Sequence, residues 1–197
     1  MGAIDTQAAQ LTDVFGGRLK MIAAFGDGSS TCAVVESLTP ADLDQCARFY
    51  AGWRRLGLHP PLLLLTSELS RGLDAFPLEF NEVIATRRLI AGTDLFASMT
   101  VPLEDLRRAC EVQARGHLLH LREGYIEAAG DPQAVTRLAS ASIAPFRALL
   151  SNIANLDGTS VDELMKRLAL GYSLKGFPEA LRAAERLVEY VDRWRQT

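Results

Sequence analysis

The sequence predicts an α+β protein, in which an α/β domain with a mixed sheet at about residues 1–97 is followed by an all-α helical bundle at about residues 98–197. Two observations lead to this prediction. In the first half, short apolar runs alternate with turns and helical segments, which is typical of strands and helices that share one sheet. From Pro102 onward, apolar residues recur at steps of three and four, and the sequence shows no convincing strand.

The first four elements are defined by local signals. A helix is expected at about Asp5–Phe15, where apolar residues follow helical spacing. The apolar runs KMIAAFG and TCAVVES predict two strands that are joined by the turn Gly26–Ser30. A second helix is expected after Thr39, which can cap it, with Pro40 in its first position and Gly57 at its end.

Three further elements complete the predicted α/β domain. The run PPLLLLT is short and bounded by proline and a polar residue, so it predicts a buried strand. The segment SELSRGLD predicts a short helix that begins at Ser67. A last strand is expected at about Leu78–Ile84, in a segment that ends at Gly92.

The second half predicts four helices. The first is a long amphipathic helix from about Pro102 to Gly130, and the second begins at Asp131-Pro132. Two more are expected at about residues 159–173 and 177–196, and Ser160 with Glu163 forms a possible capping box at the start of the third.

Composition limits the classes of function. The chain has 197 residues, 48% of them hydrophobic and 23% charged, which is ordinary for a globular protein. The formal net charge of −3 provides no overall attraction for nucleic acid or for an anionic membrane. The three cysteines are widely spaced and contain no C-x-x-C, so we expect buried free thiols rather than disulfides or a zinc site. With no signal peptide or membrane-spanning run, a cytoplasmic location is expected.

Two blocks carry a resemblance to a known family. The segment LTSELSRGLDAFPLEFNEVIATRRLIAGTDLF and the later segment LRRACEVQARGHLLHLREGYIEAAGDP resemble bacterial nucleotidyltransferase-like proteins. Those proteins combine a domain of the DNA polymerase beta-type nucleotidyltransferase superfamily with a C-terminal helical bundle. The resemblance covers roughly Leu19 to Leu150 and includes the order of the elements.

The resemblance implies a metal site that this sequence does not carry. Active members of the superfamily have Gly-Ser after the first strand and Asp-x-Asp on the next strand, because paired carboxylates hold the Mg²⁺ that neutralises the triphosphate. Here Asp27 stands where the serine is expected, and the strand TCAVVES has no Asp-x-Asp. Glu36 is its only acidic residue, while Glu79 and Glu82 are candidates for the third carboxylate. We therefore expect no catalytic residues, no metal and no cofactor, with Mg²⁺ only if the chain is nevertheless an enzyme.

The turn GDGSS has two interpretations. It could be a residual phosphate-binding or nucleotide-binding loop formed by Gly26, Asp27, Gly28 and Ser29, or it could simply reverse the chain. The negative charge of Asp27 opposes a bound anion, so we favour the simple turn.

The long helix carries a second candidate site. Arg107, Glu111, Arg115 and Arg122 lie at steps of four, four and seven, and so form one stripe. They could line a cleft between the domains and grip a phosphate or carboxylate, or they could form ion pairs that brace the interface. We favour the ion pairs. His117 and His120 lie three residues apart, but no third metal ligand is placed beside them.

The functional expectation is a catalytically degenerate nucleotidyltransferase-like protein that binds a nucleotide or another phosphorylated ligand in the cleft between its domains. The alternative is an active, divergent nucleotidyltransferase that uses Glu36, Glu79 and Glu82. A third possibility is a structural partner protein whose cleft is filled by side chains. The helical half could form a homodimer, and no nucleic-acid or membrane partner is expected. The candidate ligand-binding residues are Gly26, Asp27, Gly28, Ser29, Glu79, Arg107, Glu111 and Arg115.

Overall fold

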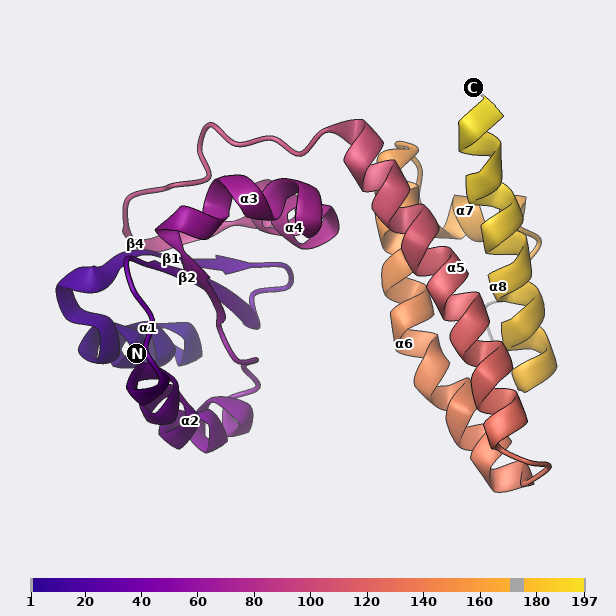
Figure 1. Cartoon of the computed structure of the whole chain (residues 1–197), viewed down its shortest axis with the longest axis horizontal. Coiled ribbons are helices and arrows are strands. Elements are labelled where there is room, and N and C mark those ends of the chain that lie inside the picture. Colours follow the sequence, from indigo (N-terminus) through magenta and orange to yellow (C-terminus); the bar gives the residue numbers. More distant parts are fainter. Residues whose placement is uncertain (1, 171–175, 197) are drawn as a thin grey trace. The chain divides into compact units, whose positions relative to one another are not determined.

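The structure is a computed structural model that describes residues 2–170 and 176–196, with the side chains of residues 195 and 196 left out. It divides into two compact units, one up to Val101 and one from Pro102 onward. The first unit contains a four-stranded mixed sheet with helices, and the described part of the second contains helices only (Figure 1). The predicted α+β class, with a mixed sheet followed by a helical bundle, is therefore confirmed. No helix in the described ranges is both long enough and apolar enough to cross a membrane.

The first unit alternates helices and strands. Its elements in chain order are α1 (Ala3–Phe15), β1 (Leu19–Phe25), β2 (Ser30–Val35), α2 (Pro40–Arg55), β3 (Leu62–Leu65), α3 (Leu69–Ala75), α4 (Pro77–Thr86) and β4 (Arg88–Gly92).

The strands are arranged in the order β3-β2-β1-β4. The β1–β2 hairpin is antiparallel, with Phe25 opposite Ser30 next to the turn. Strand β4 is antiparallel to β1, while β3 is parallel to β2. The predicted strand PPLLLLT is therefore present, but it lies at the edge of the sheet and is only half-buried. Its edge position leaves one side without a neighbouring strand.

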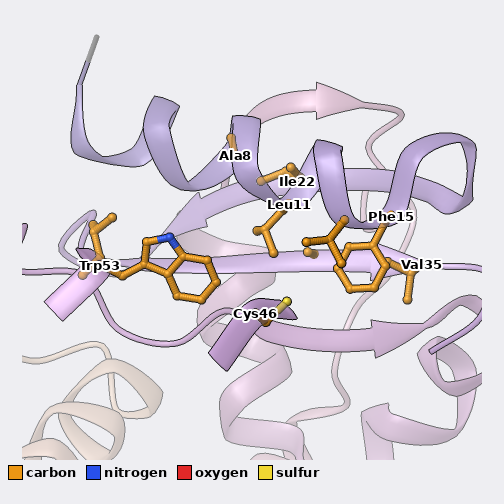
Figure 2. Packing of buried hydrophobic residues seen from close by; sticks show 10 residues of the cluster. Ala8, Leu11, Phe15, Ile22, Val35, Cys46 and Trp53 are labelled. Carbon is orange, nitrogen blue, oxygen red and sulfur yellow. The ribbon is translucent and has the colours of Figure 1, made fainter. Parts of the chain in front are cut away.

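Both faces of the sheet are covered. Because side chains alternate along a strand, Ala33 and Val35 of β2 face one core, and Cys32 and Val34 face the other. The first core lies under α1 and α2, and Figure 2 shows its side chains. The second core is completed by four residues from α3, α4 and the segment after β4: Leu69, Phe80, Val83 and Phe96.

The start of α2 follows the predicted capping signal. The Thr39 side chain accepts a hydrogen bond from the backbone N–H of Asp42, and the Asp42 carboxylate accepts one from the Thr39 N–H at 2.8 Å. This reciprocal pair satisfies two donors that the helix itself leaves unpaired.

The predicted strand at Leu78–Ile84 is wrong. That segment is helix α4, and the strand β4 begins only at Arg88. Pro77 opens α4, and the buried Phe80 and Val83 are three residues apart, which is helical rather than strand spacing. Gly92 is the last residue of β4, and only glycine fits there, because a Cβ would collide with the Lys20 carbonyl oxygen.

The second unit is a helical bundle. Its elements are α5 (Leu103–Glu127), α6 (Pro132–Leu156), α7 (Val161–Arg167) and α8 (Phe177–Asp192), followed by a short 3-10 turn (Arg193–Gln196). Helix α5 packs against both α6 and α8 (Figure 1). Within the predicted helix at 159–173, residues 171–173 lie outside the described residues. The Ser160 side chain accepts a hydrogen bond from the Glu163 N–H at 3.2 Å, which caps α7.

Candidate functional site

The turn between β1 and β2 satisfies its own hydrogen-bonding groups. Both the backbone N–H and the hydroxyl of Ser29 donate to Asp27 Oδ1, at 2.9 and 2.6 Å. These bonds, led by the hydroxyl, hold the pKa of Asp27 below its usual range. A phosphate would have to displace an ionised carboxylate that already occupies these donors. The contacts therefore support the simple-turn interpretation.

A hydrogen bond also ties this turn to α4. The Gly26 N–H donates to Thr86 Oγ1 at 2.8 Å, and the Thr86 hydroxyl donates to the Glu82 carbonyl at 2.7 Å. A Cβ on Gly26 would lie 3.1 Å from Glu82 Oε1, so the Glu82 carboxylate is beside the turn. Thr86 was missed by sequence reasoning, because its segment was predicted to follow a strand rather than to end a helix.

A shallow hollow of about 450 Å³ lies beside the turn. Asp27, Gly28 and Ser29 line it, together with Arg88 at the start of β4. Its remaining walls come from the start of α1 and from the segment that follows α2. Arg88 supplies the positive charge among the residues that line the hollow. The pairing of β4 with β1 places Arg88 opposite Ala24, and so brings it close to the turn.

The three glutamates of the divergent-enzyme alternative do not converge. Glu36 follows the far end of β2, where its carboxylate pairs with Lys20 at 2.8 Å. Glu82 lies beside the turn at the other end of the hairpin, and the six residue steps of β1 separate these ends by about 20 Å. Glu79 is exposed on α4 rather than on a strand. In residues 2–170 and 176–196, no three His, Cys, Asp or Glu side chains form a group that could hold a metal ion.

The strand that would carry Asp-x-Asp has no open face. Cys32 and Val34 of β2 are both fully buried, and so are Ala33 and Val35 on the opposite face. The aromatic ring of Phe80 belongs to the core above Cys32 and Val34, and it contacts Phe96 edge-on with ring centroids 5.9 Å apart. Apolar side chains thus fill the space that a metal ion and a triphosphate would need on that side.

The charged stripe on α5 runs along α8 of the same unit. Arg115 donates to the buried Glu111 at 3.0 Å and also pairs with Asp192 of α8. About two helical turns further along α5, Arg122 pairs with Glu185 of α8 at 3.2 Å. Arg115 and Arg122 thus form ion pairs, as favoured from the sequence, but the pairs join α5 to α8 within the second unit. Whether they also brace the two predicted domains stays a prediction.

Arg107, at the other end of the stripe, has a different environment. Its guanidinium carbon lies 6.0 Å from the centroid of the Trp194 ring, within the range of a cation–π contact. Both residues line a hollow of about 560 Å³ in the second unit, together with Glu104, Arg108 and Glu111. Two guanidinium groups beside an indole ring can bind an anionic group that is attached to a planar ring. Trp194 was missed, because its helical spacing with Leu187 and Val191 predicts bundle packing or a surface for another subunit.

Neither histidines nor cysteines supply a reactive centre in the described residues. The ring centroid of His117 lies 5.5 Å from that of Phe146, and burial lowers its pKa, whereas His120 lies exposed, 3.5 Å from Glu123. All three cysteines are free and buried, as the sequence predicts. Burial raises the pKa of Cys32 and Cys110 to about 12, which keeps both thiols protonated.

Comparisons with known proteins do not assign the chain to a family. The sequence matches no protein-family profile and no curated protein. Among solved structures, a chain in the crystal structure of a mutant of the toxin-antitoxin MntA-HpeT is similar over 64% of this chain and 97% of that chain. The sequence identity is 14% and the TM-score is 0.33. Likeness at this level defines neither the fold nor the function of the present chain.

Proposed function

We propose that this chain is a nucleotidyltransferase-like protein that does not perform metal-dependent nucleotidyl transfer and instead binds a nucleotide or another phosphorylated ligand. The observation that carries the proposal is the burial of Cys32 to Val35 of β2, which leaves neither face of that part of the strand open. Transfer of a nucleotidyl group requires metal-binding carboxylates that reach solvent and substrate. Here the corresponding strand carries Cys32 and Val34 in an apolar core.

The hollow at the start of α5 is the ligand site that we propose. The Arg107 guanidinium contacts the Trp194 ring, and Arg108 adds a second positive charge. The N-terminus of α5 is at the same place, where the helix dipole also favours an anion. A single phosphate already carries about −1.5 to −2 charge at pH 7, and Glu104 and the buried Glu111 oppose any further negative charge, which favours a ligand with one phosphate over a triphosphate.

Ligand binding can be tested by thermal shift and then by titration. We expect nucleoside monophosphates to raise the melting temperature of the native chain, since a ligand that binds only the native state stabilises it. Replacing Arg107 by Ala is expected to weaken binding about tenfold, because it removes one charge-assisted contact. The matched control is Arg137→Ala, an exposed arginine on α6 outside the hollow, which should leave the affinity unchanged. The binding proposal is wrong if no nucleotide or sugar phosphate shifts the melting temperature, and the structural-partner interpretation then takes its place.

Loss of catalysis is tested separately. The purified chain is incubated with labelled nucleoside triphosphates, Mg²⁺ or Mn²⁺ and a pool of acceptors. We expect no transfer of label above a sample without protein. Metal-dependent transfer that disappears in the Glu79→Gln variant would instead establish the divergent enzyme.

A further inference from the structure

Helix α5 carries an exposed apolar stripe that no other described element of the second unit covers. Val112, Leu119 and Ile126 are 65%, 53% and 76% exposed. They are seven residues apart, so they lie on one face of the helix with only a small drift. The contacts of α5 with α6 and α8 use its other faces. We refer to these three residues together with Gly116 as the α5 stripe.

No packing contact described in the second unit explains why position 116 of α5 is a glycine. Glycine weakens a helix interior relative to alanine, so it usually has a packing reason. At Gly124 that reason is visible, because a Cβ there would lie 2.8 Å from Leu138 of α6. At Gly116 a Cβ would meet nothing within 4 Å. A glycine in the middle of an exposed apolar stripe allows the backbone of another helix to approach closely.

We propose that the α5 stripe is a dimer interface in which α5 packs against α5 of a second copy of this chain, antiparallel and about a two-fold axis next to Gly116. The positions along the helix are symmetric about this point. Val112 and Leu119 are equally distant from it on either side, so a two-fold axis places Val112 opposite Leu119 of the second copy. Such an interface is isologous, with each residue pair occurring twice.

The charges beside the stripe select the antiparallel arrangement. Arg108 and Glu123 are each 66% exposed and are equally distant from the same point. In an antiparallel pair, Arg108 faces Glu123 of the second copy. In a parallel pair, Arg108 would face Arg108 and Glu123 would face Glu123, which is unfavourable. Within one chain Arg108 pairs with the exposed Glu104 and, at 3.6 Å, with the mostly buried Asp105, and Glu123 lies 3.5 Å from the exposed His120. Both Arg108 and Glu123 keep an exposed side chain that can exchange its outer partner for one across an interface.

The first experiment measures the mass of the full chain by sedimentation equilibrium over a wide range of concentration. We expect the mass of two chains for the wild type. Leu119→Glu places a carboxylate opposite the apolar Val112 of the second copy in both halves of the interface, and is expected to raise the dissociation constant at least tenfold. The matched control is Leu43→Glu on α2, which is 48% exposed and should keep the mass of two chains. Circular dichroism checks that both variants retain the wild-type helix content.

The second experiment tests the direction of the helices. Arg108→Glu and Glu123→Arg should each weaken self-association, since each variant creates two like-charge contacts. A mixture of the two variants should form a heterodimer about as tightly as the wild type, because both contacts are then between opposite charges. No gain on mixing would overturn the antiparallel pairing.

Other outcomes overturn the interface itself. A wild-type chain with the mass of one copy at every concentration excludes the second copy as the occupant. If Leu119→Glu then lowers the melting temperature, the stripe is covered within its own chain. A dimer that persists in Leu119→Glu uses another surface.

Discussion

At the scale of single residues, Asp42 joins two parts of the first unit. Its carboxylate accepts hydrogen bonds from both terminal nitrogens of Arg18, each at 2.8 Å, in addition to its bonds with Thr39. A bidentate pair of this kind fixes orientation as well as charge. The Arg18 guanidinium, aided by Thr39, holds the pKa of Asp42 well below its usual range.

This depressed pKa predicts a pH-dependent contribution to stability. The carboxylate is ionised in the native state at pH values where it is already protonated in the unfolded chain, so its contribution is present above the unfolded pKa of about 3.9 and is lost as the pH falls below it. Asp42→Asn should therefore lower the melting temperature at pH 7, and the difference from the wild type should narrow between pH 4 and pH 2. Thermal melts followed by circular dichroism measure this difference. Asp44→Asn, on the exposed side of the same helix, serves as the control. If the difference in melting temperature between Asp42→Asn and the wild type stays constant with pH, the pKa of Asp42 is not lowered in the native state.

At the scale of elements, the buried strand β2 explains why the catalytic pair cannot simply be restored. Cys32→Asp combined with Val34→Asp places two carboxyl groups among Leu69, Phe80 and Val83. Burying two such groups without partners costs more than about 4 kcal/mol, which is a large part of the stability of a small domain. We expect the first unit to unfold, as measured by loss of near-UV circular dichroism and by rapid proteolysis.

The matched control for this double variant is Cys32→Ala with Val34→Ala. It removes volume without adding charge and should cost about 2–4 kcal/mol in the free energy of unfolding. A folded double-aspartate variant that binds Mn²⁺ would show that the face of β2 can open, and it would revive the divergent-enzyme interpretation.

Elements with local signals could be predicted from the sequence, and those without them could not. The cap at Thr39 and the glycines of the GDGSS turn define their own boundaries, because the cap bonds are local and glycine itself permits the positive φ of the turn. The segment Leu78–Ile84 satisfies a two-residue period through Leu78, Phe80 and Ile84 as well as a helical period through Phe80 and Val83. Such short apolar runs are ambiguous, and Pro77 was the signal that favoured the helix.

The candidate sites show the same limit. The stripe of Arg107, Glu111 and Arg115 follows from helical spacing and is present on α5. Its partner helix could not be read from spacing, because Asp192 reaches Arg115 across 77 positions of the sequence. Arg88 and Trp194 also line their hollows only because elements that are distant in the sequence pack together, β4 with β1 for Arg88 and the end of α8 with the start of α5 for Trp194.

At the scale of the whole molecule, each unit closes its own core. The two cores of the first unit draw on residues up to Val101, and the core cluster around Leu118 and Leu121 draws on residues from α5 onward. The strand pairing of the sheet is also completed before Pro102. With about 100 residues each, both units have a size at which many domains fold alone.

Separating the chain between Val101 and Pro102 tests this independence. We expect residues 1–101 and residues 102–197 each to give a cooperative thermal transition, since each retains its complete core. The far-UV circular dichroism of the two pieces, added together, should equal that of the whole chain. The second piece should also self-associate with the dissociation constant of the full chain, because it contains the entire α5 stripe. A piece that is unfolded alone and folds only when the other is added would show that the two units share a core. A second piece that is folded but monomeric, beside a dimeric full chain, would place part of the dimer contact in the first unit.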